Sequence, residues 1–238
     1  MSLLDKKNGK LLVIAPHGDD EVLGAGGLIA RALDRGWEAH VFFATSGGYT
    51  NGGSGGDIPE WVSMRLTEIE KAAQFLGITS YEVLDSGIGE CVRLDTLTRR
   101  VMITALEDTL ARIRPDIVAM PCRGHYHQDH RLTAEITLGA LRPAPDGRLP
   151  FVPCVLAYGH TGAGWGGEGF QFSPNTFVDI TDVIDRKLEA LSCYQSQICP
   201  APHPRNPEAM RKDAEHWGFL SGCQYAEAYE CLRMVETI

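Results

Sequence analysis

Residues 11–30 read LLVIAPHGDDEVLGAGGLIA, and this stretch decides the fold. Its first six residues form a continuous apolar run, which is typical of a strand buried on both faces of a parallel sheet. The residues from about Asp20 onward predict a helix that ends at Gly36, because glycine commonly follows the last helical turn. Between the two lie the polar side chains of His17 and Asp19. A strand, a polar turn and a helix in this order indicate the first unit of an α/β fold.

The same alternation continues along the chain. Further strands are predicted at 39–45, 81–84 and 116–121, and the first and last of these are predicted to be buried. Further helices are predicted at 60–76, 94–113 and 130–141. Strand-like segments follow at 152–158 and 176–180, with helices at 182–195 and near 225–236. We therefore expect the α/β class, with a doubly wound, mostly parallel, Rossmann-like sheet in three α/β/α layers. No internal repeat or boundary interrupts residues 1–238, so a single domain is expected.

The composition is that of an ordinary globular protein. Of the 238 residues 44% are hydrophobic and 22% are charged, and the formal net charge is −9. A negative chain lacks the clustered basic surface that binds phosphates, so no nucleic acid partner is expected. No stretch approaches the ~20 apolar residues of a membrane span, and the N-terminus lacks a signal-peptide pattern. We expect a cytoplasmic protein with no membrane partner.

The seven cysteines are not spaced for a structural metal site. They are Cys91, Cys122, Cys154, Cys193, Cys199, Cys223 and Cys231. None forms a C-x-x-C pair, and their number is odd. Both features favour core thiols over structural zinc or a disulfide framework.

Two polar clusters each follow a predicted strand. HGDDE at 17–21 follows the first strand, and HYHQDH at 125–130 follows the fourth. The carboxyl ends of parallel strands meet at one edge of a sheet, so the clusters can share a crevice. A catalytic zinc takes three ligands from His, Asp or Glu and leaves one position for water, whose pKa falls to about 7. A nearby carboxylate and histidine can then move protons. The clusters therefore supply the parts of a metal-assisted amide hydrolysis.

Each motif also has a purely structural interpretation. HGDD alone could be a turn that caps a helix, and a lone histidine after a strand is more often a capping or surface residue than a ligand. Two clusters after two strands favour the metal site. The run Gly24-Ala25-Gly26-Gly27 could suggest a dinucleotide-binding fingerprint, but residues 17–20 already occupy the turn where its glycines belong. Close packing of small residues against the sheet is the better interpretation.

The two clusters resemble motifs of the LmbE-like, or PIG-L, N-deacetylase family. The first is similar to the family's opening A-H-P-D-D-E motif, and the second to its H-P-D-H motif. Segments similar to the later family pattern are Arg65-x-x-Glu68 with Ala72 and Gly77, PNTFVDIT at 174–181, and residues 187–197. Gly18 and Gln128 replace prolines of the motifs, and neither proline supplies a ligand. Because glycine is more flexible than proline, the first loop is expected to be held by its neighbours.

The resemblance implies a role for each matched residue. The ligands of a Zn2+ ion would be His17, Asp20 and His130. Asp19 would be the general base, and His127, held by Asp129, would stabilise the oxyanion or protonate the leaving amine. Arg65 and His125 would contact substrate. Glu21 has two open roles, a hydrogen bond behind the metal ligands or a first-turn helix carboxylate.

The family acts mostly on N-acetylglucosamine derivatives. The resemblance therefore implies an enzyme, a metal-dependent N-deacetylase of linear amides, whose partner is a small N-acylated amino sugar. Two alternatives stay open: a metal-dependent hydrolase of another amide or ester, and a non-enzymatic nucleotide-binding protein. The glycine-rich residues 47–56, a lid in one interpretation, and residues 160–172 are expected at the pocket rim, where Trp165 would stack on a sugar or lie at an interface. The sequence is compatible with a homo-oligomer and does not select one.

Overall fold

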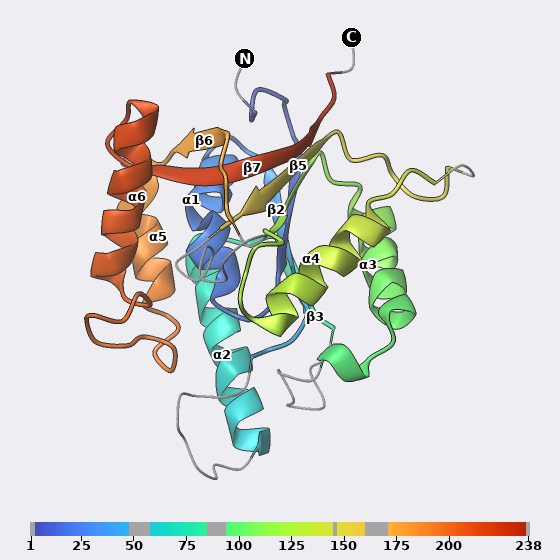
Figure 1. Ribbon diagram of the computed structural model, residues 1–238, viewed down its shortest axis with the longest axis horizontal. Helices are drawn as coiled ribbons and strands as arrows, with labels where there is room; N and C mark the ends of the chain where they lie inside the picture. The colour runs from blue at the N-terminus through green and yellow to red at the C-terminus, as the bar shows by residue number, and fades with distance from the viewer. Residues whose placement is uncertain (1–2, 48–57, 85–93, 145–146, 160–170, 237–238) are drawn as a thin grey trace.

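A twisted sheet crosses the molecule and helices cover both of its faces (Figure 1). The computed structural model describes residues 3–47, 58–84, 94–144, 147–159 and 171–236. Its strands are β1 (Lys10–Ala15), β2 (Glu38–Phe43), β3 (Ser80–Val83), β4 (Ile117–Pro121), β5 (Cys154–Tyr158), β6 (Thr176–Asp179) and β7 (Ala226–Met234). Its helices are α1 (Asp20–Asp34), α2 (Ile58–Leu76), α3 (Arg99–Ile113), α4 (Gln128–Ala140), α5 (Ile184–Leu191) and α6 (Pro207–Ser221), with short 3-10 turns at Leu94–Thr96 and Thr181–Val183.

The sheet has seven strands in the order β3-β2-β1-β4-β5-β7-β6. The first five strands pair in parallel, whereas β7 runs antiparallel to both β5 and β6. Chain order runs outward from β1 in both directions, so β1 and β4, which are far apart in sequence, lie side by side. The predicted doubly wound, mostly parallel sheet is confirmed.

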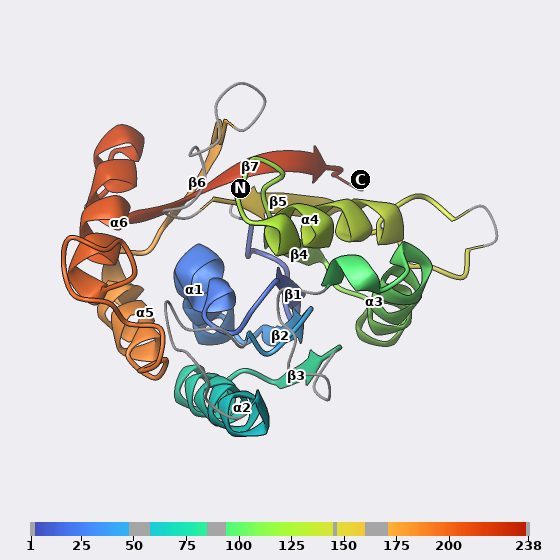
Figure 2. The same ribbon diagram turned by 60° about the horizontal axis from the view of Figure 1, so that its bottom comes forward.

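Alternate residues of β1 feed two separate cores. Leu11 and Val13 pack with α1, α2, α5 and α6, whereas Leu12 and Ile14 pack with α3 and α4 (Figure 2). All four side chains are fully buried, which explains why the sequence is continuously apolar here instead of alternating. The helix layers on either side complete the predicted three-layer arrangement. None of the described helices is long and apolar enough to cross a membrane.

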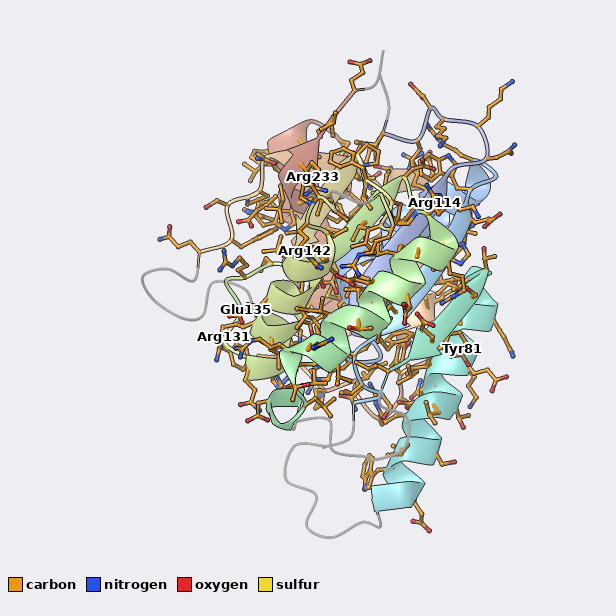
Figure 3. The ribbon with its side chains drawn as sticks, turned by 90° about the vertical axis from the view of Figure 1, so that its right-hand side faces the viewer. Tyr81, Arg114, Arg131, Glu135, Arg142 and Arg233 are labelled. Atoms are coloured by element: carbon orange, nitrogen blue, oxygen red, sulfur yellow. The ribbon has the colours of Figure 1, made fainter. Side chains whose placement is uncertain are left out.

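The prediction for the C-terminal region is wrong. Residues near 225–236 were expected to form a helix, but Ala226–Met234 form strand β7, and the helix of this region is α6. Alanine, glutamate, leucine and arginine favour helices in isolation, but long-range pairing between β5 and β6 overrides that propensity. Arg233 of β7 donates to the carbonyls of Val152 and Leu141, 3.2 Å and 3.0 Å away, and so ties the strand to the end of α4 (Figure 3).

Two other predicted helices are shorter than expected. The helix at 94–113 is divided into a 3-10 turn and α3, because Thr98 has extended dihedral angles of φ −68° and ψ 135°. The helix at 182–195 begins as a 3-10 turn, and α5 ends at Leu191. The expected rim segments at 48–56 and 160–170, with Trp165, lie outside the described residues.

Glycines in α1 let the helix approach its neighbours. A Cβ on Gly24 would lie 2.1 Å from the ring of Tyr158, and one on Gly27 would lie 2.4 Å from Ile180. Such distances leave no room for a side chain, so the interpretation of close small-residue packing is confirmed. The contact brings the start of α1 against the carboxyl end of the sheet.

Candidate active site

The two polar clusters meet at the carboxyl ends of β1 and β4. His17 follows β1, and its ring centroid lies 5.0 Å from that of His127 and 5.2 Å from that of His130. The strands are parallel neighbours, so two segments more than 100 residues apart emerge side by side. The two clusters therefore meet at one edge of the sheet, as the topology predicts.

Two overlapping groups of side chains could each hold a metal ion. In one, Asp20 Oδ2 lies 3.2 Å from His17 Nδ1 and 3.3 Å from His130 Nε2. The other group combines His17 with His127 and Asp129, and in both groups the ligand atoms lie within 4.8 Å of one another. These are the only such groups in the described part of the chain. Imidazole nitrogens with a carboxylate oxygen are a donor set that zinc takes in catalytic sites, so the residues fit the metal.

The first loop is held by groups outside it. Asp19 has φ 102° and ψ −30°, a left-handed conformation that costs a non-glycine residue about 1–3 kcal/mol. The carboxylate of Glu21 accepts a hydrogen bond from the Asp19 amide at 3.0 Å. The guanidinium of Arg65 donates to the carbonyl of Gly18. The expectation that neighbours hold this glycine-containing loop is confirmed.

Glu21 supports the loop and does not line the crevice. It is fully buried, and the hydroxyl of Tyr194 donates to its second carboxylate oxygen. Burial raises the pKa of Glu21 to about 8. Of its two open roles, the structure therefore favours a hydrogen bond behind the loop, made to the backbone of Asp19.

The second loop is ordered by the start of α4. His127 is the N-cap residue of this helix, and its Nδ1 accepts a hydrogen bond from the Asp129 amide at 3.2 Å. The Asp129 carboxylate is fully buried and lies 3.1 Å from His17 Nε2, closer than the 4.0 Å to His127 Nδ1. Asp129 thus links the two loops and does more than hold His127.

Arg65 and His125 are both buried and engaged with protein groups. Arg65 is 1% exposed and donates to Glu68 at 2.6 Å and to Ser196 at 3.1 Å, besides Gly18. The His125 ring stacks on His130 with centroids 3.9 Å apart. Its Nδ1 accepts a hydrogen bond from the amide of His127. Both side chains contact the two polar loops, and the direct substrate contact expected for them stays a prediction.

Charge in the crevice is dominated by carboxylates. Burial and the nearby Asp20 raise the pKa of Asp19 to about 6. Burial by itself would lower the pKa of His17, but hydrogen bonds to Asp129 and Asp20 outweigh it and raise that pKa to about 10. The protein thus holds a positive charge on His17 between two acids. A bound divalent cation would supply that charge instead and favour the neutral, ligating imidazole.

Sequence analysis missed one charged neighbour of the site. Arg205 Nη1 lies 3.9 Å from Asp19 Oδ2 and also donates to Gln197 at 2.8 Å. No motif marks this arginine, because it comes from the segment before α6, far along the chain. Tyr194 was noted only as part of a family-like segment, and its contact with Glu21 becomes visible only in three dimensions.

Comparison with known proteins gives a consistent family. The PIG-L family, described as GlcNAc-PI de-N-acetylase, matches residues 12–141. Diacetylchitobiose deacetylase of Thermococcus kodakarensis is 32% identical over 225 residues, covering 92% of this chain and 81% of that protein. A 4-oxalmesaconate hydratase of Pseudomonas putida is 30% identical, covering 78% of this chain and 73% of that protein.

Solved structures show the same fold. The N,N'-diacetylchitobiose deacetylase of Pyrococcus horikoshii superposes with a TM-score of 0.74 at 25% identity, covering 96% of this chain and 85% of the other. The match to the PIG-L family, which runs from β1 through α4, includes both polar clusters. The chain is therefore an enzyme that belongs to the PIG-L family.

Proposed function

We propose that this chain is a zinc-dependent hydrolase that removes an N-acetyl group from a small amino sugar. One observation carries the proposal: the ligand atoms of His17, Asp20 and His130 lie within 4.8 Å of one another. Support for the substrate class comes from relatives named as deacetylases of diacetylchitobiose and of a 2-acetamido-2-deoxy-glucopyranoside of inositol. The acyl group would leave as acetate.

Zinc bound by these three residues would polarise the acyl carbonyl and make a water molecule acidic. Asp19 is the proposed general base, because it directly precedes Asp20, interacts electrostatically with Asp20 and His17, and belongs to neither ligand group. A base works best when its pKa lies not far below the working pH, and burial with Asp20 raises the pKa of Asp19 to about 6. Its strained backbone is held in place by Glu21.

His127 is the proposed hydrogen-bond donor to the oxyanion. Its side chain is 30% exposed, so a substrate can reach it, and burial together with His17 lowers its pKa. The bond from the Asp129 amide to Nδ1 fixes the ring and leaves Nε2 for the substrate. The neutral ring would donate from Nε2 to the oxyanion that forms when water attacks the carbonyl. The proton that Asp19 takes from the water would then pass to the leaving amine.

Arg65 and His125 are assigned positioning roles in this proposal. Arg65 holds the carbonyl before Asp19, and His125 supports the ring of His130 and the amide of His127. Both act on substrate through the residues that they support. The direct substrate contact that the family resemblance implies for both side chains stays part of the proposal.

A product assay tests the function directly. The zinc-loaded protein is incubated with N,N'-diacetylchitobiose, with N-acetylglucosaminyl inositol and with N-acetylglucosaminyl malate, and acetate and new primary amine are measured. We expect equimolar acetate and amine from at least one of them, with loss of both after chelation.

A second arm separates deacetylation from the other chemistry found among the relatives. One curated relative is a hydratase, so an unsaturated dicarboxylic acid is included and water addition is followed by loss of its ultraviolet absorbance. Hydration without acetate release from any acetylated sugar would overturn the proposal.

A further inference from the structure

Helix α1 is broken at its second turn. Ala25 has φ −145° and ψ 16°, far from helical values, so the helix consists of a first turn and a longer second part. The first turn begins at Asp20 and directly follows Asp19. The direction of this turn therefore decides where two residues of the proposed site point.

The backbone groups on either side of the break contact a buried ion pair. In a regular helix the amide of Gly27 would bind the carbonyl of Leu23. Here Lys187 Nζ donates to the Leu23 carbonyl at 3.0 Å, and the Glu227 carboxylate accepts from the Gly27 amide at 2.7 Å. The same carboxylate accepts from Leu28 at 2.8 Å. Lys187 and Glu227 are themselves 2.7 Å apart.

We propose that Lys187 and Glu227 are positioning residues of the active site. Their ion pair replaces the backbone hydrogen bonding at the break and fixes the angle between the first turn of α1 and the rest of the helix. The angle in turn sets the position of the Asp19 and Asp20 carboxylates. The inference rests on the proposed metal site, because its consequence is read out at that site.

The signs of the two charges suit the two helix ends. The first turn ends at Leu23, where carbonyls carry partial negative charge, and a lysine lies there. The second part starts at Gly27 and Leu28, where amides carry partial positive charge, and a carboxylate lies there. Each charge of the pair thus lies at the backbone groups of opposite partial charge, one set at the end of the first turn and the other at the start of the second part. This division of the hydrogen bonds favours a role at the break over a role in core packing alone.

Burial makes the arrangement specific. The side chains of Lys187 and Glu227 are only 4% and 3% exposed. Because water cannot solvate these buried charges, the protein must supply their hydrogen-bond partners. Glu227 accepts a further bond from the hydroxyl of Tyr229 at 2.7 Å. Helix α1 packs against both elements that carry the pair, α5 with Lys187 and β7 with Glu227 (Figures 1 and 2).

The glycine run in α1 makes room for the pair. A Cβ on Gly26 would lie 3.1 Å from Lys187 Cγ, and a Cβ on Gly27 would lie 3.1 Å from the carboxyl carbon of Glu227. Both distances are too short for comfortable contact. These glycines therefore admit the ion pair to the helix backbone, which accounts for part of a motif that the proposed chemistry leaves unexplained.

The test compares metal affinity with stability. Zinc dissociation constants are measured by competition with a chromophoric chelator for the wild type, Lys187→Met, Glu227→Gln and a control, Leu106→Ala. Leu106 is fully buried in α3, in the core on the opposite side of the sheet, so its truncation lowers stability without touching α1. Melting temperatures of all four proteins are recorded, and binding is measured where each is folded.

We expect Lys187→Met and Glu227→Gln to weaken zinc binding ~10-fold or more, as supporting groups of metal ligands typically do. The visible spectrum of the cobalt-loaded variants should also change, because the Asp20 ligand is displaced. Leu106→Ala should bind zinc within about twofold of the wild type despite its lower melting temperature, because a substitution rarely affects a distant site with which it shares no contacts.

Three results separate the possible failures. If Lys187→Met and Glu227→Gln are folded and keep the zinc affinity and the cobalt spectrum of the wild type, the inference is overturned. If Lys187→Met does not fold, Glu227→Gln and the milder Gly26→Ala, which pushes on Lys187, decide the matter by the same two readouts. A wild-type protein that binds no zinc would overturn the proposed function itself, and with it this inference.

Discussion

Asp19 directly precedes the proposed metal ligand Asp20 but belongs to neither ligand group. Asp19→Asn removes the base and keeps the side-chain size, so we expect zinc content to be retained while kcat falls ~10²- to 10⁴-fold. Metal analysis and steady-state kinetics on one preparation check this. Loss of zinc from Asp19→Asn, with zinc retained by His17→Ala, would show that the two roles are exchanged.

Gly18 occupies a place where the family motif has proline, and its surroundings explain the difference. A Cβ on Gly18 would lie 2.6 Å from Ile69 Cγ1. Gly18→Ala should therefore cost about 1–3 kcal/mol of unfolding free energy through overpacking. Ile69→Ala removes the obstacle, so the double variant should be more stable than the sum of the single effects predicts, by about 1 kcal/mol in a denaturant-unfolding cycle. Strict additivity would contradict this account.

At the scale of elements, local patterns predicted six of the seven strands of the described sheet but missed β7. Strands β1 and β4 were found because each is a continuous apolar run. The sequence of β7 contains good helix formers, and its strand state depends on partners more than 60 residues away in β5. Helix α6 could have been found, because Asn206, Pro207 and Gly222 mark its start and end.

The start of α6 gives a prediction at this scale. Asn206 Oδ1 accepts a hydrogen bond from the Ala209 amide at 2.9 Å, which satisfies a free donor of the first turn. Asn206→Ala should lower the free energy of unfolding by about 1 kcal/mol, whereas Asn206→Asp should retain the cap. Urea unfolding midpoints of both variants measure the difference. Equal losses in the two variants would exclude a capping role.

The candidate site shows the same division between local and distant information. Both polar clusters could be predicted from motifs that follow strands, whereas the proposed set of metal ligands came from the family resemblance. The supports behind them could not, because Tyr194, Arg205 and Glu227 reach the first loop and α1 from segments more than 170 residues away. Short sequence patterns thus predict which residues supply the chemistry, whereas the positions of these side chains depend on tertiary contacts.

At the scale of the whole molecule, the sheet holds the ligands independently of the metal. His17 and His130 follow adjacent parallel strands, and the last strand, β7, lies inside the sheet, which supports the prediction of one domain. We expect the chelated protein to remain folded and to regain activity with zinc. Zinc at 100 times its dissociation constant should add about 2.7 kcal/mol of stability, read as a rise in melting temperature. Unfolding on chelation would show that the metal is structural.

The left-handed backbone conformation of Asp19 implies a trade-off between catalytic activity and folding stability. Glycine adopts such dihedral angles freely, so Asp19→Gly should raise the free energy of unfolding by about 1 kcal/mol while abolishing turnover, and Asp19→Ala should abolish turnover without that gain. Calorimetry on the two inactive variants would measure the difference. Without selection for activity, mutation would then favour the more stable, inactive glycine variant. The aspartate at this position therefore indicates that turnover is under selection.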